Sequence, residues 1–266
     1  MTVFWGMLAL ILMLPAILIP WISKTDSSAF LMRAALFIAL VGSSFTTMIH
    51  LMGHWDGGVS ISLWITISFS LLLFLCFSLL VKEFEKLALL LAPYLFVLGV
   101  FAVVWEGQSA TANPIESMDN WLVLHILASI LTYALCTLAA ISAVSVQLRE
   151  RALKLKKVES PFLIKLPSVY DADRFQVSLL TMAEVVLGLG ILTGFARQYS
   201  ASGHFLGFDH KSLLALIAFV VIAILLILHK FIGIRGQSAV RFVLAVYLLL
   251  TLAYPGVKFV TDVLLA

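Results

Sequence analysis

Eight long apolar runs follow one another along this 266-residue chain, and each is about as long as a helix that crosses a membrane. About 20 mostly apolar residues are needed to cross a hydrocarbon core of about 30 Å. We predict transmembrane helices over residues 3–23, 29–52, 60–81, 86–105, 121–148, 175–197, 210–230 and 237–265. The expected fold is an all-α, polytopic membrane helix bundle that forms a single transmembrane domain over residues 1–266.

Composition agrees with this fold class. Hydrophobic residues make up 62% of the chain and charged residues only 12%, whereas about 25% of residues are charged in soluble domains. The net charge of +3 does not indicate nucleic-acid binding, because the basic residues gather in loops on one side of the predicted membrane. We therefore expect the lipid bilayer, and no nucleic acid, as a partner.

The basic residues also predict the orientation of the helices. The segment 149–174 is the longest connection and is rich in lysine and arginine, so the positive-inside rule places it in the cytoplasm. Alternation of the helices then puts both termini on the outer, periplasmic side. Of the 17 lysine and arginine residues, this topology leaves only Arg197, Lys211 and Lys258 outside.

Histidines and tryptophans collect on the predicted outer side. Of six histidines, five lie there: His50, His54, His125, His204 and His210. The tryptophans on that side are Trp5, Trp55, Trp64, Trp105 and Trp121. At 1.5 Å per helical residue, His125 lies about 6 Å deeper than Trp121, which is too deep for a casual surface position.

Helical spacing places these histidines on polar stripes, because residues three or four apart share one face. The stripes are Ser43, Thr46 or Thr47, His50 and His54 on the second predicted helix; Ser62, Thr66 and Ser70 on the third; and Trp121, His125, Ser129, Thr132 and Cys136 on the fifth. In lipid such stripes face the bundle interior. Each histidine is then either a hydrogen-bonded packing residue or a ligand to a metal or to haem iron.

Two other chemistries fit parts of the pattern. The acids predicted on the outer side could support a zinc hydrolase: Asp56, Glu106, Glu116, Asp119, Asp209 and Asp262. However, "HLMGH" lacks the glutamate of a metalloprotease helix. Glu184, in mid-membrane before Gly188, Gly190 and Gly194, could move protons or ions; the simpler interpretation is a neutral carboxyl beside a close helix contact at the glycines.

The second half of the chain resembles a known family. The segments "WLVLHILASILTYALCTLAAISAVSVQLRERALK", "FDHKSLLALIAFVVIAILL" and "GQSAVRFVLAVYLLLTLAYPGVKFV" resemble the integral membrane cytochrome c assembly family, in its small eight-helix branch of CcsA-like, HemX-like and YpjD proteins. The resemblance is clear over residues 115–266. It implies a multi-pass protein of the bacterial inner membrane that binds haem near the outer leaflet.

By this resemblance, His50 and His210 correspond to an external pair of haem-iron ligands, and His125 corresponds to the membrane-embedded histidine of the family. Trp55, Trp105 and Trp121 are then expected to line the haem-binding groove.

Cytochrome c synthases of the family carry an outer segment of the WGxxWxWD type, whereas the corresponding segment here is "WEGQSATANPIESMDNW". We therefore expect haem binding, haem passage or regulation rather than an enzyme that attaches haem to thiols. The alternative is a non-catalytic assembly or regulatory subunit. Such a subunit would dock another membrane or haem-pathway protein through the basic segment 149–174.

Overall fold

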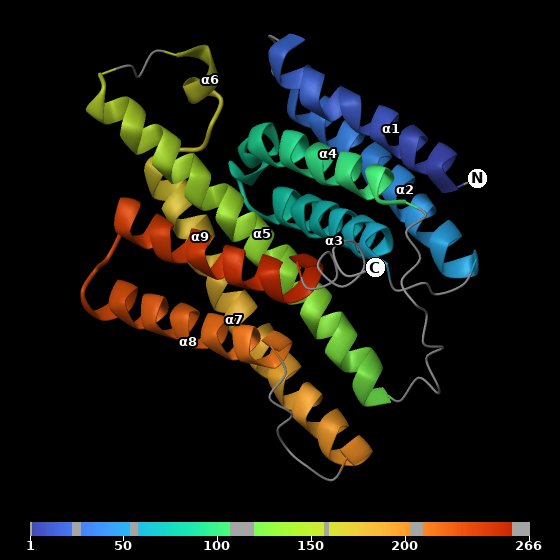
Figure 1. The fold of residues 1–266 in the computed structure, drawn as a ribbon. Coiled ribbons are helices and arrows are strands. Elements are labelled where there is room, and N and C mark those ends of the chain that lie inside the picture. The colour runs from blue at the N-terminus through green and yellow to red at the C-terminus, as the bar shows by residue number, and fades with distance from the viewer. Residues whose placement is uncertain are drawn as a thin grey trace. The chain divides into compact units, whose positions relative to one another are not determined.

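A computed structural model describes residues 2–22, 28–53, 58–106, 120–156, 160–202 and 210–256 of the protein (Figure 1). Within these ranges all regular structure is helical, and no strand is found. Eight helices of the described part are long and apolar enough to cross a membrane. The predicted all-α, eight-helix membrane fold is confirmed.

The described helices begin and end close to the predicted runs. They are α1 (Thr2–Ile22), α2 (Ser28–Gly53), α3 (Val59–Leu80), the 3₁₀ helix η1 (Phe84–Leu87), α4 (Ala88–Val104), α5 (Asn120–Lys154), α6 (Pro161–Ile164), α7 (Val169–Ser202), α8 (His210–Phe231), α9 (Gln237–Thr251) and the π-helix η2 (Leu252–Gly256). The last predicted helix, 237–265, is helical as far as Gly256, and the rest of it lies outside the described residues.

Two helices extend further than predicted. Helix α5 continues past residue 148 to Lys154, because its last turns, "RERALK", consist of strong helix formers. Helix α7 begins at Val169 rather than at residue 175. Its start is capped by Ser168, whose Oγ accepts a hydrogen bond from the backbone N–H of Asp171 at 3.1 Å. In both cases charged residues mark the predicted edge of the membrane and not the end of the helix.

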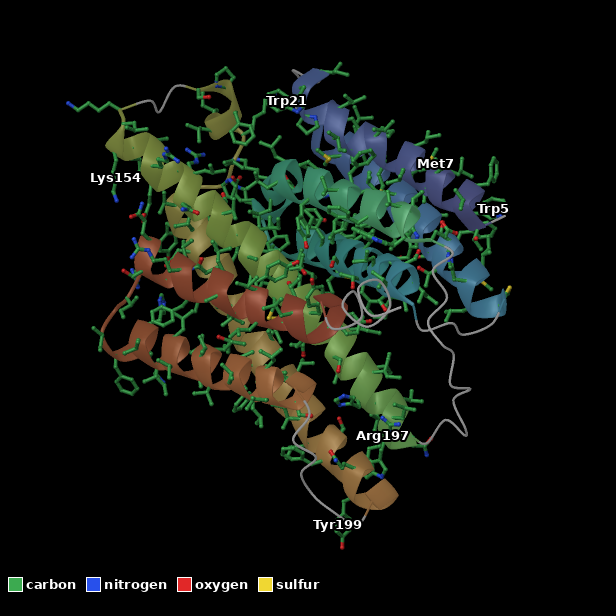
Figure 2. The ribbon with its side chains drawn as sticks, viewed as in Figure 1. Trp5, Met7, Trp21, Lys154, Arg197 and Tyr199 are labelled. Carbon is green, nitrogen blue, oxygen red and sulfur yellow. The ribbon has the colours of Figure 1, made fainter. Side chains whose placement is uncertain are left out.

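The basic segment 149–174 is partly a packed element rather than an open loop. Buried Leu163 and Leu166 form an apolar cluster with Leu89 and Ala152. The Arg149 guanidinium donates to the Leu166 carbonyl, and the Lys165 ammonium donates to the Pro20 carbonyl. Exposed basic side chains remain at Arg151, Lys154 and Lys156, and Figure 2 shows Lys154 at the end of α5.

The chain forms two compact units. The first consists of the described parts of Met1–Ala112 and Leu148–Asp171, and the second of the described parts of Asn113–Gln147 and Ala172–Val257. The single transmembrane domain expected from the sequence stays a prediction.

Four helices form most of the first unit (Figure 1). Helix α1 packs against α2 and α4, and α3 packs against the same two neighbours, so the four helices close a ring. Large apolar side chains fill its centre, among them Trp64, Phe74 and Leu95, each fully buried. The opposite face of α1 exposes an apolar stripe of Phe4, Met7, Ile11, Leu14 and Leu18, as expected for a helix that faces lipid. Trp5 and Trp21 lie near opposite ends of this helix (Figure 2).

The second unit contains residues 120–147 of α5 together with most of α7, and α8, α9 and η2. Helix α8 packs against α9, and both contact η2. Small residues let α7 approach its neighbours closely: a Cβ at Gly190 would lie 3.3 Å from Ala128 Cβ on α5, and one at Gly188 would lie 3.3 Å from the Phe219 ring on α8. The close helix contact predicted at these glycines is confirmed.

Candidate functional site

The polar stripe of α2 faces the interior of the first unit, as predicted. Ser43 is completely buried, and its hydroxyl accepts a hydrogen bond from Ser68 on α3 at 3.1 Å. Thr47 Oγ1 lies 3.4 Å from the same Ser68 hydroxyl. The predicted α3 stripe of Ser62, Thr66 and Ser70 is also buried. These contacts fix the rotation of α2 about its axis and so aim His50 inward.

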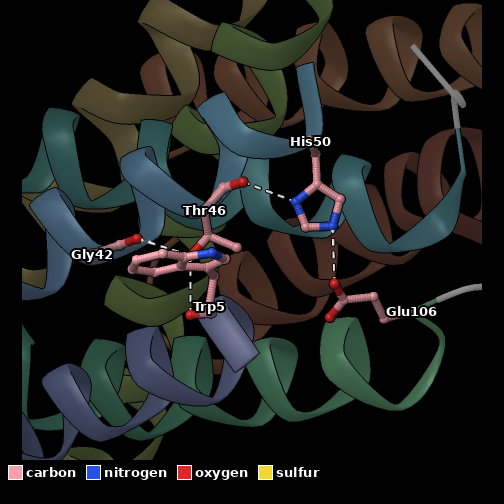
Figure 3. Close-up of polar contacts among 5 residues, drawn as sticks. All are labelled: Trp5, Gly42, Thr46, His50 and Glu106. Atoms are coloured by element: carbon pink, nitrogen blue, oxygen red, sulfur yellow. Dashed lines mark hydrogen bonds and ion pairs between the residues drawn. The ribbon is translucent and has the colours of Figure 1, made fainter. Parts of the chain in front are cut away.

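His50 is the last described residue of the α2 stripe and is held by its own helix (Figure 3). Its Nδ1 lies 2.8 Å from the carbonyl oxygen of Thr46. The Thr46 hydroxyl in turn donates to the Gly42 carbonyl at 3.0 Å and lies 3.3 Å from the Trp5 carbonyl. Because a carbonyl oxygen only accepts hydrogen bonds, Nδ1 carries the hydrogen. The other ring nitrogen, Nε2, is therefore the one that can bind a ligand or an acid.

An acid from the end of α4 faces that nitrogen. Glu106 Oε1 lies 3.3 Å from His50 Nε2, and the side chains of His50 and Glu106 are only 14% and 3% exposed. The two residues are far apart in the chain, and the ring of four helices brings them together (Figure 3). Sequence reasoning named Glu106 only as one of six outer acids. One feature of the sequence could have singled out Glu106. It directly follows the predicted helix 86–105, which ends on the same predicted outer side as the predicted helix 29–52 that carries His50.

A glycine on α1 makes room for this acid. A Cβ at Gly6 would lie 3.2 Å from Glu106 Oε2 and 3.4 Å from Trp64 Cζ2. Trp64 is fully buried, so it is a core residue of the first unit rather than part of an interfacial belt. Neither Glu106 oxygen nor Trp64 Nε1 has a hydrogen-bond partner among the described residues. Among the described residues, the Glu106 carboxyl makes an ion-pair contact with His50.

His125 is held in the same way within the second unit. Its Nδ1 lies 2.8 Å from the Gly190 carbonyl oxygen on α7, which again leaves Nε2 as the nitrogen with a free lone pair. Gly194, one turn further along α7, makes room for the ring, since a Cβ there would lie 3.1 Å from His125 Cε1 and 3.2 Å from Nδ1. On α7, Gly190 thus accepts a hydrogen bond from the His125 ring, and Gly194 leaves the space that the ring fills.

A cavity of about 200 Å³ adjoins His125 in the second unit. Side chains from α5, α7, α8, α9 and η2 line it, including His125, Ser129, Thr132, Tyr133 and Tyr254. Tyr133 also stacks on Tyr247 with ring centroids 5.7 Å apart. The Thr132 hydroxyl is buried with no hydrogen-bond partner in the described part of the chain. The cavity therefore combines aromatic walls, hydroxyl groups and one imidazole.

The other predicted site residues are placed as follows. Trp105 stacks on Phe101, with ring centroids 5.2 Å apart, and the Trp121 side chain is 43% exposed. His210 begins α8, but its side chain lies outside the described part of the structure, as do residues His54, Trp55 and His204. The groove and the ligand pair of His50 and His210 stay predictions.

The described residues bear differently on the two alternative chemistries. Among these residues, no group of three or more His, Cys, Asp or Glu side chains is arranged to hold a metal ion. Glu184 is half-buried, and its Oε2 has no hydrogen-bond partner within the described ranges.

Comparison with known proteins decides the family. The sequence profile described as "Cytochrome C assembly protein" matches residues 3–265. The chain belongs to the cytochrome c assembly protein family. This confirms the resemblance found in the sequence and extends it over the first half of the chain. Family membership and eight membrane-length helices together establish a multi-pass membrane protein.

Two relatives are similar in sequence to this chain over most of its length. It is 41% identical over 267 residues to the "Uncharacterized 28.8 kDa protein in nifR3-like 5'region" of Azospirillum brasilense, which covers 99% of this chain and 98% of the relative. It is 26% identical over 229 residues to the inner membrane protein YpjD of Escherichia coli K12, which covers 85% of each chain. No solved structure gives a significant match to the chain.

Proposed function

We propose that this member of the cytochrome c assembly protein family binds and handles haem in a bacterial inner membrane, with both termini on the periplasmic side and haem held near the outer leaflet by histidines. His125 is the proposed imidazole ligand of haem iron within the second unit, and His50 and His210 stay the predicted external pair of ligands. Family membership and the name of the inner membrane relative support the general role.

The observation that carries the proposal is the way His125 is held. Its Nδ1–H donates to the Gly190 carbonyl, it sits against Gly194, and it lines a cavity with aromatic and hydroxyl groups. Histidines that bind metals almost always donate their other ring N–H to a carbonyl or a carboxylate, which fixes the ring and makes the free nitrogen more basic. A histidine that served only to join α5 to α7 would need neither the cavity nor the open Nε2.

The donor chemistry of this site fits haem. Bound haem would supply a redox-active iron, which an imidazole nitrogen can ligate. The His125 ring supplies that nitrogen, and Tyr133 and Tyr254 supply aromatic surface beside it. At about 200 Å³ the cavity is smaller than the 300–1,000 Å³, roughly, of sites that enclose drug-sized ligands. The cavity therefore has room for the immediate surroundings of the His125 nitrogen, but it is too small to enclose the whole haem macrocycle.

The residues of this chain can orient the imidazole, exclude lipid and offer hydroxyl groups to a polar edge of a ligand. The outer segment lacks the tryptophan-rich motif of the synthases, so the proposal is binding and passage of haem rather than its covalent attachment. The hydrogen bond from His125 to Gly190 acts before haem arrives, since it fixes the orientation of the ring.

The test is the visible absorption spectrum of the detergent-purified protein after haem addition, with haem quantified as the pyridine haemochrome. The wild-type protein should bind near-stoichiometric haem with a Soret band. His125→Ala should lower the haem affinity at least tenfold or change the spin state of the iron, since an imidazole ligand is lost.

His229→Ala is the matched control. His229 makes the same Nδ1 hydrogen bond, to the Ile234 carbonyl at 2.8 Å, but does not line the cavity. Its replacement should leave the spectrum unchanged. A His125→Ala protein with a wild-type spectrum and affinity, or a His229→Ala protein that loses haem, would contradict the proposal.

A further inference from the structure

The end of α5 in the first unit carries basic side chains that are not neutralised within the described part of the chain. Residues 149–156 read "RERALKLK", with four cationic side chains and one acidic side chain. The Arg149 guanidinium already donates to the Leu166 carbonyl. The other three cations are exposed and form no salt bridge with a described residue; they are Arg151, Lys154 and Lys156.

Other basic side chains of the first unit are paired. Arg33 on α2 forms a salt bridge with Glu85 of η1, and Lys86 forms one with Glu83. In both places an acid of the same unit neutralises the cation. The end of α5 differs from these places, because its positive charge remains available to an anion from outside the chain.

The three cations lie at the depth of lipid headgroups. The apolar run that predicts the crossing ends at residue 148, and α5 continues to Lys154. At 1.5 Å per residue, Arg151 lies about 4.5 Å and Lys154 about 9 Å beyond that end along the helix axis. The headgroup layer on each side of a bilayer is about 5–8 Å thick. Helix α5 therefore carries these cations through the layer in which phospholipid phosphates lie.

Exposed apolar side chains accompany the cations. Leu155 lies between Lys154 and Lys156 in the sequence and is 57% exposed, and Ile164 on α6 is 61% exposed. The buried cluster that contains Leu163 of α6 and Ala152 of α5 holds the two helices together. Basic and apolar groups side by side are typical of segments that lie in the membrane interface.

Trp21 extends this apolar surface to the end of α1. Its indole is 59% exposed and stacks on Phe162 of α6, with ring centroids 6.0 Å apart and an interplanar angle of 18°. The Lys165 ammonium lies 5.9 Å from the Trp21 ring centroid and donates to the Pro20 carbonyl. These contacts fix α6 between the end of α1 and the end of α5, where Figure 2 labels Trp21 and Lys154. Tryptophan is enriched at membrane–water interfaces.

We propose that this membrane edge of the first unit binds an anionic phospholipid. The α5–α6 surface, as we name it, consists of Trp21, Arg151, Lys154, Leu155, Lys156 and Ile164. The three cations contact the headgroup, and the acyl chains cover the three apolar side chains. Positive charge favours an anionic over a zwitterionic lipid. The exposed apolar groups favour a lipid over free phosphate or a soluble acidic protein segment, either of which would leave them in water.

Lipid binding at the α5–α6 surface stands apart from the proposed function. It requires neither haem nor a histidine, and it applies whichever leaflet the surface faces. Loss of haem binding and loss of lipid binding are therefore separate results.

The test is a lipid titration of the detergent-purified full-length protein, followed by native mass spectrometry. The probes are phosphatidylglycerol and phosphatidylcholine with the same acyl chains. The wild-type protein should bind phosphatidylglycerol about tenfold more tightly. The triple variant Arg151→Gln, Lys154→Gln and Lys156→Gln should lose at least about tenfold in affinity for phosphatidylglycerol and bind the two lipids equally, because the cations that select the anionic headgroup are gone.

A second triple variant is the matched control. Lys230→Gln, Arg235→Gln and Arg241→Gln remove the same charge from exposed positions of the second unit. This variant should keep the wild-type preference for phosphatidylglycerol. If it lost as much affinity as the first triple variant, net charge rather than the α5–α6 surface would select the lipid, and the proposal would be overturned.

The apolar half of the surface needs its own variant. Leu155→Asn with Ile164→Asn should weaken phosphatidylglycerol binding about tenfold and leave the preference over phosphatidylcholine in place. Glycerol phosphate is the probe for a free phosphate site, and polyglutamate is the probe for an acidic protein segment. Either of them bound by the wild type as tightly as phosphatidylglycerol would overturn the proposal.

Folding is checked in the same samples. All substituted side chains are exposed, so circular dichroism and the unfolding temperature without added lipid should match the wild type. Lys154→Gln alone replaces the triple variant if that protein fails to fold, and it should lose about fivefold in affinity for phosphatidylglycerol. A wild-type protein that binds the two lipids equally contradicts the proposal, whatever its haem content.

Discussion

The two units of the molecule hold their histidines in the same way but offer them differently. In each, a ring Nδ1 lies 2.8 Å from a backbone carbonyl oxygen, of Thr46 for His50 and of Gly190 for His125. In the first unit the remaining nitrogen faces the buried carboxyl of Glu106. In the second unit the histidine lines a cavity.

This difference separates two properties of a ligand histidine. The backbone hydrogen bond sets which nitrogen is free, and the residues around that nitrogen set whether it is available. His125 is ready to bind a ligand as it stands, whereas His50 must first exchange one partner for another. We therefore expect His125 to engage haem more readily than His50 in protein that starts without haem.

The largest effect is expected from Gly194→Leu in the second unit. A Cβ at this position would already lie 3.1 Å from the His125 ring, so a leucine must displace the imidazole from its seat. Haem affinity should fall at least tenfold, as for His125→Ala, in a titration followed by the Soret band. Gly188→Leu is the control, because its neighbour is Phe219 rather than His125; equal losses in both variants would mean that α7 packing, and not the histidine, is responsible.

An intermediate effect is expected from Gly6→Ala in the first unit. The added methyl would lie 2.9 Å from Val103 Cγ2 and 3.2 Å from Glu106 Oε2, so it should cost about 1–3 kcal/mol of stability by overpacking and push the Glu106 carboxyl off His50. The rate at which diethyl pyrocarbonate modifies His50, measured by mass spectrometry, should rise because the ring then loses its contact with the carboxyl.

Gly99→Ala serves as the comparison for Gly6→Ala. It crowds Leu10 at 2.7 Å at the same α1–α4 contact and does not touch Glu106. It should therefore destabilise the unit without a change in the His50 rate. A rise in both variants would show that loosened helix packing alone exposes His50.

The smallest effect is expected from Ser68→Ala. It removes the hydroxyl that donates to Ser43 at 3.1 Å between α3 and α2. Hydrogen bonds between membrane helices contribute about 0.6 kcal/mol on average, and unfolding in mixed micelles should show a loss of that size. Ser44→Ala, at an exposed position of α2, should cost nothing measurable; a loss above about 2 kcal/mol for Ser68→Ala would assign the stripe a larger role than simple helix pairing.

Much of the fold follows from the sequence, because the bilayer imposes a length on every helix that crosses it. The eight apolar runs predict the long helices to within several residues at most ends. The prediction is poorest at Lys154 and Val169, where α5 and α7 continue beyond the apolar run. Hydropathy identifies the membrane crossing, and helix propensity and the Ser168 cap set the actual ends.

The site could be predicted only in part. Helical spacing identifies His50 and His125 as inward-facing, and the glycines of α7 as a close contact. It does not reveal that Gly190 and Gly194 seat His125, or that Glu106 meets His50. Those pairs join distant parts of the chain, and they depend on which helices are neighbours and how each is rotated. Periodicity within one helix carries neither piece of information.

Replacement of His125 by glycine, with and without added imidazole, tests the central claim most directly. The substitution removes the ligand but leaves a space of the same shape beside Gly194, so free imidazole can take the place of the side chain. We predict that His125→Gly loses the wild-type Soret band and that millimolar imidazole, roughly, restores it. A His125→Gly protein whose spectrum matches the wild type without imidazole would contradict the claim that His125 binds haem iron.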